Sequence, residues 1–223
     1  MRARLAEYRR MGARFANWRA VFTIGAATAS RACMLANAHA LARYAALCQE
    51  AGLVPVVEPE VLMAGEHTLS RCGQVTEDVL RVVFSQLEEQ GVMLEGMLLK
   101  PNMILPGRDC PIQDPVQALA EATRTCLRRT VPAAVAGIAF LSGGQSGDLA
   151  TTRLAAINNS TGSPLPWPVA FSFGRAIQQP ALTIRDGQDA NVARARQALQ
   201  RRVTSNRDAR RGTDTLPPGR VDA

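Results

Sequence analysis

Short apolar segments alternate with longer amphipathic segments along most of the 223-residue chain. Segments of the first kind are typical of buried strands, and those of the second kind are typical of helices with one apolar face. Strands that alternate with helices favour a parallel sheet with right-handed crossovers. The expected strands cover residues 18–22, 53–58, 94–100, 135–141 and 168–173, and the expected helices cover residues 30–49, 76–90, 114–128, 147–157 and 189–203. The sequence therefore predicts an α/β fold with about five parallel strands alternating with helices.

One domain over residues 1–204 accommodates all of these segments, because a chain of this length can bury a sizeable core. The remaining residues, 205–223, mix arginine with aspartate and contain no aromatic side chain. Such a composition is typical of solvated segments. We therefore expect a single α/β domain followed by a disordered C-terminal tail over residues 205–223.

The composition argues against several classes of partner. The formal net charge is +7, but neither stacking aromatics nor a reading helix accompanies the charge, so nucleic-acid binding is not expected. No apolar run approaches the ~20 residues of a membrane span, so no membrane partner is expected either. An arginine-rich start is also found in organellar targeting segments, but Glu7 follows soon, and we expect a cytoplasmic location.

Cysteine and histidine usage bears on redox state and metal binding. The five cysteines are odd in number and show no C-x-x-C spacing, which indicates reduced thiols rather than a disulfide framework. The two histidines, His39 and His67, lie far apart in the sequence, so a histidine-rich zinc site is difficult to build. We expect neither a metal nor another cofactor.

Polar or glycine residues follow each expected strand. The carboxyl ends of parallel strands meet at one rim of the sheet, where α/β proteins place their sites. The residues at this rim are Arg19 with Thr23, Glu58, Lys100, Ser142 to Gly144, and Ser172 to Arg175. We therefore expect functional side chains to gather at one end of the sheet.

Lys100 is the only lysine among the 26 basic residues of the chain. Arginine matches its charge but stays protonated, so arginine cannot serve as an amine nucleophile. A lysine at a strand end can also extend its ammonium into water without a chemical role, and its position alone leaves both interpretations open. If the amine is used, the chemistry that it favours is Schiff-base formation with a carbonyl.

Glu58 and Glu60 lie two residues apart, so in an extended segment both side chains point to the same side. Two close carboxylates disfavour simultaneous ionisation, which suits a proton shuttle. Pro59 can instead end the strand here, which would leave the two carboxylates in a solvated loop. Beside an amine at the same rim, Glu58 becomes the candidate acid or base.

Glycine-containing turns follow the last two expected strands. The first turn, Ser142-Gly143-Gly144, precedes a helix, where backbone amides can approach an anion closely. The second turn contains Ser172, Gly174 and Arg175, and its guanidinium is well suited to phosphate. The first turn also occurs in the signature of ABC-type ATPases, but the chain lacks the G-x-x-x-x-G-K-[ST] loop of such proteins.

Several stretches of the chain resemble motifs of class I fructose-bisphosphate aldolase. They are Val56 to Glu60, Leu94 to Met103, Phe140 to Ser146 and Phe171 to Ala176, supported by Leu41 to Ala45 and Leu127 to Pro132. The resemblance runs from about Leu5 to about Gln200. It implies part of a TIM (β/α)8 barrel whose N-terminal strands are missing. It also implies a carbon–carbon lyase of glycolysis that cleaves fructose 1,6-bisphosphate to dihydroxyacetone phosphate and glyceraldehyde 3-phosphate.

The same resemblance implies roles for individual residues. Lys100 matches the Schiff-base lysine, and Glu58 matches the carboxylate that transfers protons, with Glu60 beside it. Arg19 matches an active-site arginine. The pocket for the ketose-end phosphate is matched by Ser142, Gly143, Gly144, Ser172, Gly174 and Arg175. The family further implies a metal-independent mechanism, a phosphosugar substrate and a homotetramer.

The chain departs from the family pattern at Asn17 and Thr23, where the family has lysines, and it lacks the family's C-terminal tyrosine. Asn17 cannot supply the positive charge that a lysine would place near Lys100. Five strands instead of eight also leave unpaired edges and an uncovered inner face. We therefore expect weak or no aldol cleavage, with imine formation at Lys100 retained. The corresponding hypothesis is an aldolase-derived chain that is a truncated gene product, an isoform or an incomplete gene model.

Two other interpretations stay open. A non-catalytic, aldolase-like protein that binds phosphosugars or assembles with aldolase-like subunits would account for Asn17, whereas Lys100 and Glu58 favour catalysis. An open nucleotide-binding sheet is the third interpretation, but no G-x-G-x-x-G motif follows the first expected strand.

Overall fold

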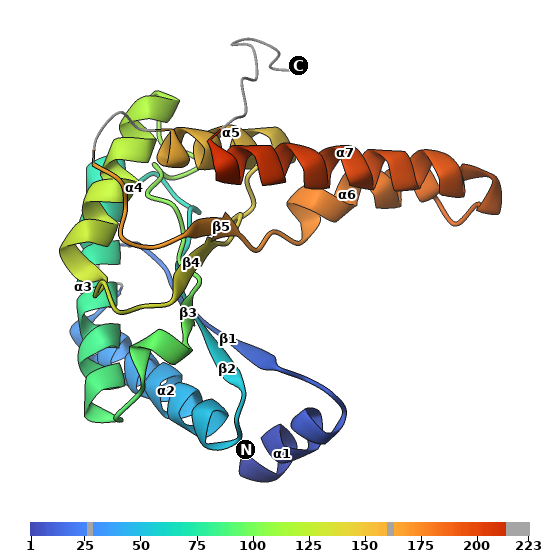
Figure 1. Ribbon diagram of the computed structural model, residues 1–223. Coiled ribbons are helices and arrows are strands. Elements are labelled where there is room, and N and C mark those ends of the chain that lie inside the picture. The colour runs from blue at the N-terminus through green and yellow to red at the C-terminus, as the bar shows by residue number, and fades with distance from the viewer. Residues whose placement is uncertain (26–28, 160–162, 213–223) are drawn as a thin grey trace.

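The computed structural model describes residues 1–25, 29–159 and 163–212, and within these ranges five parallel strands form one sheet in the order β1-β2-β3-β4-β5 (Figure 1). The strands are β1 (Phe15–Phe22), β2 (Val54–Val61), β3 (Leu98–Leu99), β4 (Gly137–Phe140) and β5 (Val169–Phe171). The α-helices are α1 (Arg2–Arg10), α2 (Arg31–Glu50), α3 (Leu69–Glu89), α4 (Val116–Thr130), α5 (Gly147–Asn158), α6 (Arg175–Arg185) and α7 (Val192–Arg211). The predicted α/β fold with about five parallel strands is confirmed.

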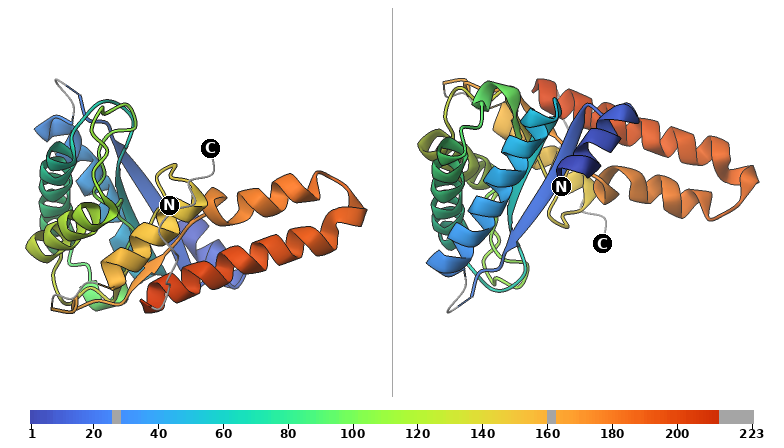
Figure 2. Two further views of the ribbon diagram at one scale, coloured as in Figure 1. Left: turned by 90° about the horizontal axis from the view of Figure 1, so that it is seen from above. Right: turned by 90° about the horizontal axis from the view of Figure 1, so that it is seen from below.

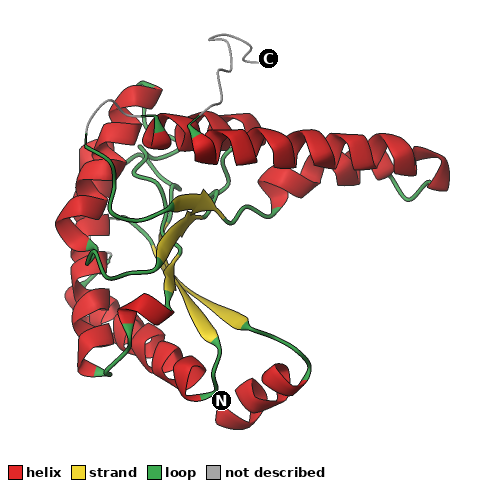
Figure 3. Cartoon of the chain, in the orientation of Figure 1, coloured by secondary structure: helices red, strands yellow, loops and turns green. Residues whose placement is uncertain are grey.

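Helices α2, α3 and α4 lie side by side along one face of the sheet (Figures 1 and 3). The core between these helices and the strands is apolar, with Leu41, Leu80 and Leu127 on the helices and Val57 and Leu99 on the strands all buried. Burial of such side chains supplies the main driving force for folding. Among the described residues, no helix is both long and apolar enough to cross a membrane.

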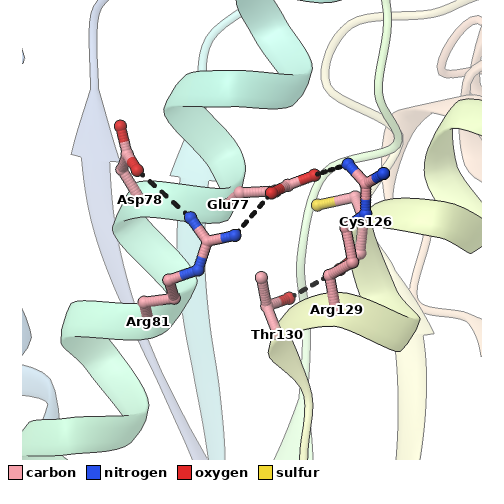
Figure 4. Close-up of polar contacts among 6 residues, drawn as sticks. All are labelled: Glu77, Asp78, Arg81, Cys126, Arg129 and Thr130. Atoms are coloured by element: carbon pink, nitrogen blue, oxygen red, sulfur yellow. Dashed lines mark hydrogen bonds and ion pairs between the residues drawn. The ribbon is translucent and has the colours of Figure 1, made fainter.

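A polar network joins α3 to α4 at the outer surface (Figure 4). The Glu77 carboxylate accepts from Arg81 at 2.6 Å and from Arg129 at 3.1 Å, so one acid joins the two helices. Burial raises the pKa of the nearby Cys126 thiol to about 12, and the negative charge of Glu77 adds to this effect. Cys126 is therefore a protonated packing residue, and none of the five cysteines forms a disulfide.

The opposite face of the sheet is open along β1. Ala20 and Phe22 are buried, whereas Asn17, Arg19 and Val21 point to the other face and are exposed. Within the described ranges, β1 pairs only with β2, so its outer edge has no neighbouring strand. The candidate site residues on β1 therefore lie at a sheet edge that is accessible to solvent.

Helices α6 and α7 form an antiparallel pair that projects away from the sheet (Figures 1 and 2). The C-terminal half of α7 returns to pack on α5, where the buried Asn206 accepts a hydrogen bond from Thr151 at 3.1 Å. Ala209 is also fully buried. The tail predicted over residues 205–223 is therefore wrong in its boundary, because packing against α5 continues the helix to Arg211. Residues 213–223 lie outside the described residues.

Other element boundaries also differ from the predictions, for local reasons. Helix α3 begins at Leu69 rather than residue 76, because Thr68 caps its N-terminus and accepts from the amide of Arg71. The strand predicted over residues 94–100 is paired only at Leu98–Leu99, and residues 94–96 form a 3-10 turn. Helices α1 and α6 were not predicted; Pro180 within α6 interrupts the helical pattern of the sequence.

Candidate active site

The register between β2 and β3 places Lys100 beside Glu58. Val57 lies opposite Leu99 in the sheet, and the amide of Lys100 continues the ladder by donating to the carbonyl of Val57 at 2.8 Å. Leu99 is fully buried, so the next side chain along the chain points to the opposite face of the sheet. On that face, Lys100 Nζ lies 3.2 Å from Oε1 of Glu58, and the lysine side chain is 16% exposed. The amine is thus largely shielded and already in contact with a carboxylate.

The second oxygen of Glu58 contacts β1. Asn17 Nδ2 donates a hydrogen bond to Oε2 of Glu58 at 2.6 Å. Glu58 is buried, and a buried carboxylate requires partners for its oxygens. Lys100 and Asn17 satisfy one oxygen each, which holds the carboxylate in a fixed orientation toward the amine.

Glu60 forms a second acid–base contact on the same face of β2. Its Oε2 accepts from Arg19 Nη1 at 3.0 Å, and the side chain is buried. Burial raises the pKa of Glu60 above its ordinary value; the charge of Arg19 opposes this effect, and the negative charge of Glu58 reinforces it. The prediction that both carboxylates point to one side is confirmed by these contacts.

A pocket of about 710 Å³ lies beyond the ends of β4 and β5. The N-termini of α5 and α6 approach each other at this pocket, since a Cβ atom on Gly147 would lie 2.5 Å from the carbonyl oxygen of Ala176. Helix N-termini present free amide donors that favour anions. The pocket is lined by Arg108, Ser142, Gly144, Gln145, Ser146, Gly147, Arg175, Ala176, Gln179, Pro180, Thr183 and Ile184.

The structure brings only some of the predicted phosphate residues together. Ser142, Gly144 and Arg175 line the pocket, whereas Gly143, Ser172 and Gly174 do not. Those three residues shape the turns instead. Gly143 and Gly144 have positive φ angles of 59° and 88°, Ser172 donates its amide to the carbonyl of Phe140, and Gly174 precedes α6 as its N-cap residue. Backbone dihedrals with positive φ favour glycine at both positions of the first turn.

Sequence reasoning did not single out Arg108 and Gln145, which line this pocket, or Arg153, which contacts Gln145. Arg108 comes from the loop after Lys100, where no strand or helix pattern pointed to it. Gln145 lines the pocket and accepts a hydrogen bond from Arg153 Nη1 at 2.7 Å, so Arg153 helps to fix the position of the Gln145 side chain. Burial lowers the pKa of Arg153. The one available signal was the dipeptide Pro106-Gly107, which is typical of a turn.

The distribution of acids, cysteines and histidines bears on metal binding. In the three described ranges, no group of three or more such side chains is arranged to hold a metal ion. His67 is partly buried, and both of its ring nitrogens lack hydrogen-bond partners. Burial lowers its pKa, which favours the neutral imidazole.

Comparison with known proteins agrees with this arrangement. A family model described as fructose-bisphosphate aldolase class-I matches residues 1–217. The chain belongs to the class I fructose-bisphosphate aldolase family. It is 52% identical over 207 residues to a probable class 1 aldolase of Xylella fastidiosa, an alignment that covers 92% of this chain and 61% of that protein. A cytosolic aldolase of Arabidopsis thaliana is 52% identical over 213 residues, covering 96% of this chain and 59% of the relative.

A solved aldolase structure has the same fold. The Plasmodium falciparum aldolase, determined in complex with TRAP and a small-molecule inhibitor, matches with a TM-score of 0.94 and 44% identity. The match covers 97% of this chain and 62% of the Plasmodium chain. The predicted partial aldolase barrel is thereby confirmed. The chain spans about 60% of the length of the aldolases that it matches.

Proposed function

We propose that this aldolase chain forms a Schiff base between Lys100 and the carbonyl of a phosphorylated ketose, in the manner of class I cleavage of fructose 1,6-bisphosphate to dihydroxyacetone phosphate and glyceraldehyde 3-phosphate. The observation that carries the proposal is the 3.2 Å contact between the largely buried side chains of Lys100 and Glu58, from Nζ to Oε1. No other lysine exists in the chain to perform this chemistry.

The Lys100–Glu58 contact supports each proton transfer of imine formation. Transfer of a proton from the ammonium to Glu58 frees the amine for attack on the carbonyl carbon. The protonated Glu58 then returns a proton to the carbinolamine hydroxyl, which leaves as water when the carbon–nitrogen double bond forms. The resulting iminium accepts the electron pair of the bond between its α and β carbons while the ionised Glu58 takes the proton of the β-hydroxyl. Cleavage of this bond releases an aldehyde and leaves an enamine on Lys100. The protonated Glu58 then returns the proton to the α carbon, and water hydrolyses the product imine to free the amine.

The pocket beyond β4 and β5 supports binding of the phosphate end of such a ketose. Phosphate held by loops after the last strands of a barrel and by a helix N-terminus is a recurring arrangement. Ser142 and Arg175 offer a hydroxyl and a guanidinium there, and Gly144 allows close backbone approach. In this assignment Glu60 and Arg19 act beside Glu58, where their contact maintains the charge balance of the β2 face.

A second candidate is a non-catalytic phosphosugar-binding or assembly protein. The observation that favours it is the hydrogen bond from Asn17 to Glu58, because a neutral amide stands where the family has a lysine. Asn17 therefore supplies no positive charge beside the amine of Lys100. We therefore propose that aldol cleavage by the chain is weak and that imine formation is the more sensitive measure of its chemistry.

Location and assembly are proposed from the relatives. The Arabidopsis thaliana relative is described as cytosolic and a Pisum sativum relative as a cytoplasmic isozyme, which supports a cytoplasmic location for this chain. The homotetramer implied by the family resemblance stays a prediction, to be checked by sedimentation of the purified chain.

Borohydride trapping tests the catalytic proposal directly. The chain is incubated with dihydroxyacetone phosphate, reduced with borohydride and analysed by peptide mass spectrometry. We expect an adduct on the peptide that contains Lys100 and none in Lys100→Arg, which keeps the charge but removes the reactive amine. Because Lys100 is the only lysine, the remaining amine is the N-terminus, and an adduct that survives in Lys100→Arg reports that group. Phosphosugar binding without an adduct at Lys100 would instead favour the non-catalytic candidate.

A further inference from the structure

We propose that Arg108 is a specificity-determining residue that supplies a second guanidinium to the pocket and selects dianionic phosphate over neutral ligands. The inference deepens the proposed function, since it takes the same pocket as the phosphate site. Arg108 lies outside the sequence motifs that resemble the family, and its position in the structure places it at the pocket.

The backbone of the Arg108 loop is fixed by contacts with a distant segment. The amide of Arg108 donates to the carbonyl of Met63 at 2.7 Å, and the amide of Gly107 donates to the carbonyl of His67 at 2.7 Å. A Cβ atom at Gly107 would lie only 2.0 Å from the carbonyl oxygen of Gly65, so the two backbones can approach this closely only at glycine. The loop therefore presents the arginine side chain from a defined position, although the residue itself is exposed.

The guanidinium of Arg108 lies over the glycine turn that follows β4. A Cβ atom built on Gly144 would be 3.2 Å from Nη2 of Arg108. Arg108 and Gly144 both line the 710 Å³ pocket, and so does Arg175 at the start of α6. The arginine thus reaches the turn from a third loop, after β3, in addition to the loops after β4 and β5.

The charges of the pocket are not balanced by protein acids. Its lining contains two arginines and no aspartate or glutamate. Among the described residues, neither Arg108 nor Arg175 takes part in an ion pair, in contrast to Lys100 and Arg19. Arg153 adds a third positive charge behind Gln145. Two planar guanidiniums with free N–H groups match the several oxygens of a phosphate dianion better than they match the hydroxyl or carbonyl group of a neutral ligand.

The contribution of Arg108 to phosphate binding is measured with two ligands that share the phosphate group. Binding of dihydroxyacetone phosphate and of inorganic phosphate to the 223-residue chain is measured by calorimetry above pH ~7, where the phosphate is a dianion. We expect Arg108→Gln to raise both dissociation constants about tenfold, which is the ordinary effect of losing a charge-assisted contact. Arg108→Lys should fall between wild type and Arg108→Gln, because it keeps the charge but not the fork.

The matched control is Arg43→Gln, an identical change at an exposed arginine on the outer helix α2. It should leave both dissociation constants within about twofold of wild type, so that a loss confined to Arg108→Gln reflects the pocket and not the net charge. Equal dissociation constants for Arg108→Gln and Arg43→Gln would overturn the inference. So would the absence of phosphate binding by the wild-type chain. Circular dichroism confirms that each variant is folded.

Borohydride trapping separates this inference from the proposed function. For each variant, the amount of adduct formed with dihydroxyacetone phosphate is divided by the amount formed with dihydroxyacetone. This ratio should be about tenfold higher in the wild type than in Arg108→Gln. If phosphate binding depends on Arg108 while no adduct forms at Lys100, the inference stands and the catalytic proposal fails. If adduct forms at Lys100 with a ratio that Arg108→Gln does not change, the catalytic proposal stands and the inference fails.

Discussion

The two halves of the candidate site treat charge in opposite ways. On β2, Glu58 and Glu60 are buried, and each contacts a base, Lys100 or Arg19. In the pocket beyond β4 and β5, Arg108 and Arg175 are exposed and have no ion-pair partner among the described residues. The charges on the β2 face are thus paired with one another within the protein, whereas the pocket keeps a net positive charge.

This difference indicates how each half of the candidate site contributes to stability and to ligand binding. Charges that satisfy one another inside the fold are coupled to stability, because removal of one partner leaves the other buried without compensation. Charges that remain open to solvent contribute little to stability and are available to an external anion. The β2 face is thus suited to proton transfer between fixed groups, and the pocket is suited to holding a charged substrate.

The largest effect on stability is expected from breaking the buried pair. Lys100→Met should lower the free energy of unfolding by about 3 kcal/mol, because Glu58 would then be buried with only Asn17 as a partner. The additional change Glu58→Gln should restore most of this loss, since it removes the uncompensated charge. Urea unfolding of the wild type, both single variants and the double variant gives the coupling energy.

The matched comparison for the pocket is Arg175→Gln, which removes an exposed charge and should change stability by less than about 0.5 kcal/mol. An equal loss of stability in Lys100→Met and Arg175→Gln would show that the two halves are not different in this respect.

An intermediate effect is expected at the glycine turn. Gly144→Ala should lower the free energy of unfolding by about 1 to 2 kcal/mol, because the residue has a φ of 88° that alanine rarely adopts. The new methyl group would also lie 3.2 Å from Arg108 Nη2 and should displace the guanidinium. Thermal unfolding and phosphate affinity are measured on the same variant.

Gly174→Ala is the control for this turn, since Gly174 has no positive φ and its Cβ position is free of neighbours within 4 Å. We expect wild-type stability within about 0.5 kcal/mol. If both alanine variants behave alike, backbone conformation at Gly144 does not limit the turn.

The smallest effect is the pH dependence contributed by Glu60. Burial raises the pKa of this carboxyl in the folded protein above its ordinary value of 4.5. The folded state therefore holds the proton more tightly than the unfolded state, and this contribution to stability is complete below pH 4.5 and is lost as pH rises through the folded pKa. The difference in Tm between Glu60→Gln and the wild type should accordingly increase, in favour of the variant, as pH rises through this window.

Arg19→Gln sharpens this measurement. The positive charge of Arg19 lowers the pKa of Glu60, so its removal should extend the window to higher pH. A Tm difference between wild type and Glu60→Gln that stays constant across the window would show that Glu60 does not titrate differently on folding.

Prediction from the sequence succeeded where the relevant chemistry is local or follows from strand register. Lys100 and Glu58 end up in contact because neighbouring parallel strands place successive side chains on known faces, so strand ends alone indicated the pair. Prediction from the sequence failed where packing between distant segments decides the length of an element. Helix α7 continues past residue 205 because Asn206 and Ala209 are buried against α5, and the polar sequence of that region does not reveal such a contact.

The amino-acid sequence by itself determined the alternation of strands and helices, the single lysine and the two glutamates at the expected strand ends, since these depend on side-chain type and on period along the chain. Only the tertiary structure decided that Arg108 belongs to the pocket and that Gly143, Ser172 and Gly174 shape turns without lining it. The physical reason is that a loop is positioned by its hydrogen bonds to other segments, here residues 107–108 to residues 63 and 67. Those partners are remote in sequence, and no local pattern specifies them.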